Sequence, residues 1–140
     1  MKKYEFFEHT ADAKFRAYGK TIEEAFSNAA LAMTSVITDV AKVKPIVMTH
    51  FSVEGKDLKA LLYNFLEEFL FLIDTENFFL SVVKEIRIEK QKGNFVLHAT
   101  ISGDDIKNYE THGDIKAVTY NEMEINEEKG KCMVQVVVDI

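Results

Sequence analysis

The 140-residue chain contains one cysteine, one proline, six glycines and no tryptophan. A single cysteine excludes an internal disulfide and a cysteine-based zinc cluster, and it is typical of a reducing compartment. With so few prolines and glycines there is no linker or low-complexity tract, so residues 1–140 are expected to form a single domain. The start of the chain lacks the apolar core of a signal peptide, and the most apolar later run, 58–73, is interrupted by Glu67 and Glu68. We therefore expect a cytoplasmic protein without membrane contact.

The charge balance is acidic, with 23 Asp and Glu against 17 Lys and Arg and a net charge of -6. Such a chain repels phosphate backbones, because nucleic-acid affinity depends on neutralising phosphates with cationic side chains. Autonomous nucleic-acid binding is therefore not expected, whereas docking on a basic, RNA-binding enzyme is favoured.

Spacing and capping residues predict strands and two helices in the first half of the chain. Phe15 and Ala17 share one side of an alternating segment, as in a half-buried strand. Thr21 is followed three residues later by Glu24, a capping box that begins a helix, and Asp57 has the side chain of an N-cap. The expected elements are strands at 3–9, 13–19 and 43–55 and helices at 21–38 and 57–73.

The second half of the chain alternates as strands do. Residues 81–91 and 94–103 are expected to form a hairpin that turns at Gly93. A second hairpin is expected to pair 115–128 with 131–140 through Lys129 and Gly130, and its last strand is apolar on both faces, as a central strand is. The prediction is an α+β fold, a single compact domain with two main helices packed on one or two mostly antiparallel sheets.

Several common sites have no counterpart in the sequence. There is no P-loop, no GxGxxG after a strand and no HExxH, and the four histidines are spread singly along the chain. Cys132 occupies an apolar strand position without a nearby activating cation, so it is interpreted as a structural residue.

Two carboxylates end the chain, one on Asp139 and one at the terminus of Ile140. Adjacent carboxylates require either water or a positive partner, because like charges disfavour each other's ionisation. A solvated, frayed end is the ordinary interpretation of a terminus. The alternative is a hard divalent cation, completed by a third carboxylate for which Asp12, Asp39 and Asp74 are candidates.

Two further polar segments admit more than one interpretation. Lys116 precedes an alternating run, where it is either an ordinary solvated lysine or one presented from a loop to an anionic partner. The HTAD segment at 9–12 connects two expected strands, and its Thr and Asp suit simple turn formation as well as a functional role.

Three segments together resemble the archease family: EHTAD at 8–12, GDIKAVTYNEMEI at 113–125 and VVVDI at 136–140. The helix DLKALLYNFLEEFLFLID at 57–74 and the spacing between the segments agree with this resemblance, which covers essentially the whole chain. HTAD alone is a weak signal, and the combination in this order is specific.

The resemblance implies a protein cofactor of an RtcB-type RNA ligase, without catalytic turnover of its own. Archease promotes guanylylation and multiple turnover of this ligase in tRNA splicing and RNA repair, so tRNA would be contacted only indirectly. The family pattern also implies a divalent metal site, with Ca²⁺ expected and Mg²⁺ or Mn²⁺ as alternatives. Its ligands here would be Asp12, Asp139 and the terminal carboxylate of Ile140, and Lys116 is the lysine implied in activating the partner.

One departure from the family pattern is visible beside HTAD. The family often continues with IG or IA, whereas this chain has Ala13 and Lys14, which adds a positive charge near the expected metal site. Two other functions are left open: a metal-dependent hydrolase using the same carboxylates, and a chaperone-like or RNA-binding modulator.

Overall fold

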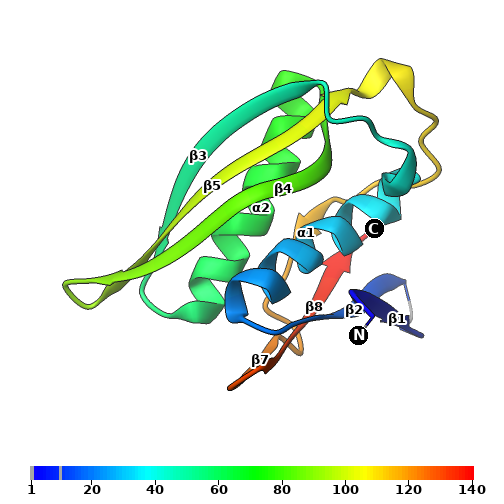
Figure 1. Ribbon diagram of the computed structural model, residues 1–140. Helices are drawn as coiled ribbons and strands as arrows, with labels where there is room; N and C mark the ends of the chain where they lie inside the picture. The colour runs from blue at the N-terminus through cyan, green and yellow to red at the C-terminus, as the bar shows by residue number, and fades with distance from the viewer. Residues whose placement is uncertain (1, 10) are drawn as a thin grey trace.

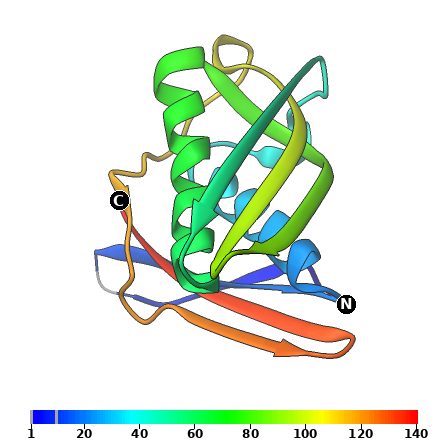
Figure 2. The ribbon, with the colours of Figure 1, turned by 90° about the vertical axis from the view of Figure 1, so that its left-hand side faces the viewer.

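The computed structural model describes residues 2–9 and 11–140, in which two helices lie between two antiparallel sheets (Figures 1 and 2). Both helices contact strands of both sheets. The helices are α1 (Ile22–Ile37) and α2 (Leu58–Glu76), and two short 3-10 turns are η1 (Val40–Lys42) and η2 (Ile106–Asn108). The α+β prediction is confirmed, with two separate sheets.

The larger sheet carries the ends of the chain. Its order is β1-β2-β8-β6, and β7 also pairs with β8, all antiparallel. The strands are β1 (Tyr4–Phe7), β2 (Asp12–Gly19), β6 (Ala117–Val118), β7 (Glu124–Glu128) and β8 (Lys131–Asp139). Strand β8 is central, as its apolar sequence predicts, because it pairs with β2 on one side and with β6 and β7 on the other.

The smaller sheet has the order β3-β5-β4. Its strands are β3 (Val47–Gly55), β4 (Phe78–Gln91) and β5 (Asn94–Asp105), and the β4–β5 hairpin turns through Lys92 and Gly93, both at positive φ. Gly103 of β5 has no room for a side chain, because a Cβ there would lie 1.9 Å from the Phe79 carbonyl oxygen.

Both helices begin at the predicted caps. The Thr21 hydroxyl accepts the Glu24 amide N–H at 3.1 Å, and the Asp57 carboxylate accepts the Ala60 amide N–H at 2.8 Å. These bonds satisfy amide groups that a helix leaves without an internal partner. Between the helices and the sheets lies one hydrophobic core that includes Phe26 and Phe65, whose ring centroids are 5.9 Å apart.

The predicted continuous strand at 115–128 is wrong. Only 117–118 and 124–128 are strands, and residues 119–123 leave the sheet in a turn in which Glu122 has φ 50°. The Thr119 hydroxyl donates to the Val137 carbonyl oxygen at 2.7 Å, and Met123 is buried beneath the turn. The Thr119 amide N–H also donates to the Val137 carbonyl oxygen, so the chain leaves the ladder after Thr119, and the turn that follows is anchored by the buried Met123. Alternation reveals neither feature.

The predicted strand at 43–55 begins later, at Val47. Val43 instead closes the η1 turn, with its amide N–H donating to the Val40 carbonyl oxygen at 3.2 Å, and its side chain is buried. Strand β4 begins at Phe78, three residues before the hairpin segment 81–91, and contains two register shifts, between Leu80 and Val82 and between Val83 and Glu85.

Candidate carboxylate and lysine site

Strand register brings Asp12 and Asp139 together. They are direct partners at the end of the antiparallel β2–β8 pair, so their side chains project from the same face of the sheet. Directly opposed side chains have Cβ atoms about 4.5–5.5 Å apart, and like charges in such a pair are destabilising. Of the three candidates for a third carboxylate, Asp12 is therefore the one that lies opposite Asp139.

The other two candidates lie elsewhere. Asp39 precedes η1 and its carboxylate is 3.9 Å from the Lys42 ammonium group. Asp74 lies on α2, in the groove that also contains Lys116. Neither is a strand partner of Asp139.

His9 links the HTAD segment to the distant turn at 119–123. Its Nε2 lies 2.8 Å from Glu122 Oε2, and its buried Nδ1 lies 3.4 Å from Asp12 Oδ2 without a hydrogen bond among the described residues. Thr10, also of the HTAD segment, lies outside the described residues.

Glu122 also neutralises Lys14, whose ammonium group donates to Glu122 Oε1 at 3.0 Å. Hydrogen bonds to His9 and then to Lys14 hold the pKa of Glu122 below its usual range. The positive charge that Lys14 adds beside the expected metal site is therefore directed toward Glu122.

Lys116 is joined to the same end of β8 through its backbone. Its amide N–H donates to the Asp139 carbonyl oxygen at 2.7 Å, and the next residue, Ala117, is the strand partner of Asp139. The Lys116 side chain is exposed and faces a groove beside α2. The three predicted residues Asp12, Asp139 and Lys116 thus lie together where β2 begins, β8 ends and the chain enters β6. These strand ends form one edge of the sheet.

The donors at this edge suit a hard divalent cation. Carboxylate oxygens are the preferred ligands of Ca²⁺ and Mg²⁺. Among the described residues, neither Asp12 nor Asp139 forms an ion pair with a lysine or an arginine. Within residues 2–9 and 11–140, no cluster of three or more His, Cys, Asp or Glu side chains is arranged to hold a metal. The predicted set has two such side chains, and its third donor is the main-chain carboxylate of Ile140.

The edge is also accessible. His9 and Asp12 line an open hollow of about 650 Å³ together with Phe6 and Phe7, which are 44% and 36% exposed. Large apolar side chains beside charged groups are typical of surfaces that contact other proteins.

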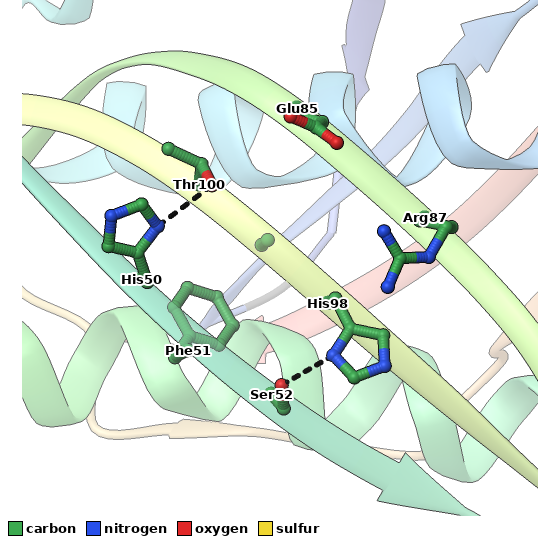
Figure 3. Close-up of a pocket in the computed structure, with 8 residues that line it drawn as sticks. His50, Phe51, Ser52, Glu85, Arg87, His98 and Thr100 are labelled. Carbon is green, nitrogen blue, oxygen red and sulfur yellow. Dashed lines mark hydrogen bonds between the residues drawn. The ribbon is translucent and has the colours of Figure 1, made fainter.

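A second polar cluster lies on the outer face of the smaller sheet (Figure 3). His50 Nδ1 is 2.9 Å from Thr100 Oγ1, and Ser52 Oγ is 2.8 Å from His98 Nδ1. Although the sequence spaces the histidines singly, the β3–β5 pairing makes His50 and His98 neighbours. Their other ring nitrogens point away from one another in Figure 3, so they do not converge on a shared metal ion.

Cys132 is buried, as its interpretation as a structural residue requires, and its thiol donates to the Glu128 carbonyl oxygen at 3.4 Å. Burial raises the pKa of the Cys132 thiol. This environment disfavours the reactive thiolate.

The sequence alone does not reveal the His9–Glu122–Lys14 cluster or the groove beside Lys116. His9 and Glu122 are 113 positions apart, and no spacing rule connects them. No local signal indicates the contact either, because alternation predicts that Glu122 is an ordinary strand residue.

The chain is similar to known proteins along nearly its whole length. A sequence profile of the archease protein family matches residues 4–140. The chain belongs to the archease family. A Pyrococcus furiosus protein archease is 41% identical over 100% of both chains, and a Methanosarcina mazei archease is 43% identical over 99% of this chain and 97% of that protein.

Solved structures extend the archease comparison to the fold. The solution structure of Methanobacterium thermoautotrophicum protein 1598 is similar, with 39% identity, a TM-score of 0.85 and full coverage of both chains. A Thermotoga maritima crystal structure, described as an archease and possible chaperone, has 15% identity and a TM-score of 0.58 over 96% of this chain and 94% of that one. The second likeness concerns the fold alone. Among the helices of the described residues, none is long and apolar enough to cross a membrane.

Proposed function

We propose that this archease-family chain activates an RtcB-type RNA ligase in tRNA splicing and RNA repair, by promoting guanylylation and multiple turnover of the ligase. The observation that supports the proposal is the meeting of the three family motifs at one edge of the larger sheet. Asp12 opposes Asp139 across β2 and β8, and Lys116 donates its amide N–H to the Asp139 carbonyl oxygen. Because the three residues are fixed by backbone pairing, they can be presented to a partner as one preorganised unit.

Asp12, Asp139 and the terminal carboxylate of Ile140 would hold a divalent cation, Ca²⁺ in our proposal. A cation at this position would neutralise the opposed carboxylates and supply a positive charge able to polarise phosphoryl oxygens. The role of Asp12 and Asp139 is to bind and orient, and Lys116, whose side chain is exposed and whose amide N–H donates to the Asp139 carbonyl oxygen, adds a cationic group to the same end of β8.

The net charge of -6 supports a protein partner in preference to RNA. An enzyme that binds RNA ends carries a positive surface, which attracts an acidic protein and speeds association. The chain would therefore reach tRNA only through the ligase.

The test is ligation by an RtcB-type ligase at limiting enzyme, scored for guanylylated ligase and for turnovers per enzyme. Adding the wild-type protein is expected to increase both quantities, and Asp12→Asn, Asp139→Asn and Lys116→Ala are each expected to remove most of the increase. Asp39→Asn and Lys42→Ala change the same residue types away from the edge and should behave as wild type. Deletion of Ile140 tests the terminal carboxylate, because it moves that group onto Asp139.

Three outcomes would contradict the proposal. Unchanged guanylylation and turnover with Asp12→Asn and Asp139→Asn would remove the carboxylates from the function. Turnover of GTP or RNA ends by the isolated protein would instead favour a metal-dependent hydrolase, and salt-dependent RNA binding by the isolated protein would favour an RNA-binding modulator.

A further inference from the structure

A groove of about 510 Å³ lies between α2 and the segment that contains Lys116 and Ala117. On the α2 side its wall is one stripe of the helix, since Asn64, Glu67, Phe71 and Asp74 are spaced by three, four and three residues. These side chains follow the helix along the groove. The rest of the lining comes from Val53 of β3 in the smaller sheet and from Lys116 and Ala117 of the larger sheet, so the groove joins the two halves of the fold.

Phe71 is the apolar feature of this stripe. Its side chain is 54% exposed, whereas Phe65 and Phe69 on the same helix are 0% and 2% exposed. A single exposed apolar residue is ordinary on a protein surface. Phe71 differs because it lies inside a groove and is flanked along the helix by the carboxylates of Glu67 and Asp74.

The charged groups of the groove are not paired with each other. Among the described residues, neither Glu67 nor Asp74 forms an ion pair, and Lys116 forms none either. Partial burial raises the pKa of Glu68, a further carboxyl group of the lining. The groove thus offers unneutralised carboxylates around an aromatic ring, which is the chemical complement of a cationic side chain beside an apolar one.

The groove is continuous with the edge that carries Asp12 and Asp139. Lys116 forms its wall and is bonded through its backbone to Asp139, at the position where Ala117 pairs with the same residue. The position of α2 is also braced, because Tyr63 stacks on Tyr120 with ring centroids 4.5 Å apart and an interplanar angle of 6°. A partner segment in the groove would therefore lie at a fixed position beside Asp139.

We propose that this groove is the docking site for a basic segment of the RNA ligase, in which Lys or Arg side chains meet Glu67 and Asp74 and an apolar side chain covers Phe71. The inference rests on the proposed function and adds the chemistry of the contact that orients Lys116. RNA itself does not fit the site, because its phosphates would face the carboxylates of the helix stripe. Aromatic residues at the centre of an interface with charges around them are the usual energetic anchors of such contacts.

The experiment measures the Kd between the purified ligase and the full-length protein by calorimetry, at low and at high salt. Glu67→Gln/Asp74→Asn removes two negative charges without changing side-chain size, and its matched control Glu127→Gln/Glu128→Gln removes two from the exposed β7 strand. Phe71→Ala removes the anchor, and Met48→Ala, at a residue that is 58% exposed on the other sheet, is its control.

We expect the Glu67→Gln/Asp74→Asn variant to raise Kd about tenfold at low salt and less at high salt, because screening weakens the charge contacts of the wild type. Phe71→Ala should raise Kd about tenfold at both salt concentrations. Activation of the ligase at a saturating concentration of either groove variant should approach activation by the wild type, since Asp12, Asp139 and Lys116 are intact. Thermal unfolding verifies that each variant is folded.

A Kd within twofold of wild type for both groove variants would overturn the docking site while leaving the proposed function standing. An equal loss of affinity in the β7 control would also overturn it, because net charge alone would then explain the effect. If the wild-type protein neither binds nor activates the ligase, the docking site and the proposed function fail together.

Discussion

Asp139→Asn tests the opposition of Asp12 and Asp139 most directly, because it removes one charge of the pair and keeps its shape. Two unit charges about 5 Å apart repel by about 0.8 kcal/mol at the dielectric constant of water and by about 3 kcal/mol at an effective value of 20. The Asp12 carboxylate lies beside His9 and lines an open, solvent-accessible hollow, so the lower end applies. Without divalent ions, Asp139→Asn should therefore raise the free energy of unfolding by about 1 kcal/mol.

With a divalent ion the order of stability should reverse. A ligand at about 100 times its Kd stabilises the native protein by about 2.7 kcal/mol. For a chain of this length that corresponds to about 8 °C in Tm, at about 3 °C per kcal/mol. Asp139→Asn should lose this increase because it removes one of the proposed ligands.

The assay is thermal unfolding followed by circular dichroism in EDTA and in increasing Ca²⁺, with Asp39→Asn as the charge-matched control. Wild type and Asp39→Asn should show the same Ca²⁺-dependent rise in Tm. A wild-type Tm that is independent of Ca²⁺, or an undiminished rise in Asp139→Asn, would refute the reasoning. A lower stability of Asp139→Asn in EDTA would show that the opposed charges are already compensated within the protein.

Three further predictions concern packing and titration. Gly103→Ala should lower the free energy of unfolding by about 3 kcal/mol or prevent folding, since its Cβ would meet the Phe79 carbonyl oxygen; urea denaturation measures this. The pKa of Glu122 is lowered, chiefly by its hydrogen bond to His9. The wild type should therefore be more stable than Glu122→Gln at neutral pH, and this difference should vanish as the pH falls below the lowered pKa of the folded protein. Denaturation at pH 7 and at pH 3 measures the difference. Cys132 should react with a thiol reagent at pH 8 far more slowly in the native than in the urea-unfolded protein, and equal rates would contradict its burial.

Much of the fold follows from local patterns. The two helices begin at the residues whose side chains cap them, Thr21 and Asp57, because capping involves groups only three residues away. The central position of β8 follows from apolar residues on both its faces. The turn at 119–123 was missed, because its anchor is a hydrogen bond from Thr119 to Val137 on another strand.

The candidate site divides in the same way. The motifs that resemble archease direct attention to Asp12, Lys116 and Asp139, and the sequence profile of the family confirms the membership. Their mutual arrangement depends on the register of β2 with β8, which is set by long-range pairing and by the turns at the ends of the strands. His9, Lys14 and Glu122 show the same limit, since hydrogen bonds between them join segments that no local period connects.

The sequence by itself determined both helices with their caps, most of the strands, the acidic charge balance and the family to which the chain belongs. These properties depend on composition and on residues within a few positions of one another. Only the tertiary structure decided that Asp12, not Asp39 or Asp74, opposes Asp139, and that Lys116 shares a groove with the acidic stripe of α2. Such neighbours are determined by how two sheets close around two helices, because packing and strand pairing bring together side chains whose sequence positions carry no information about each other.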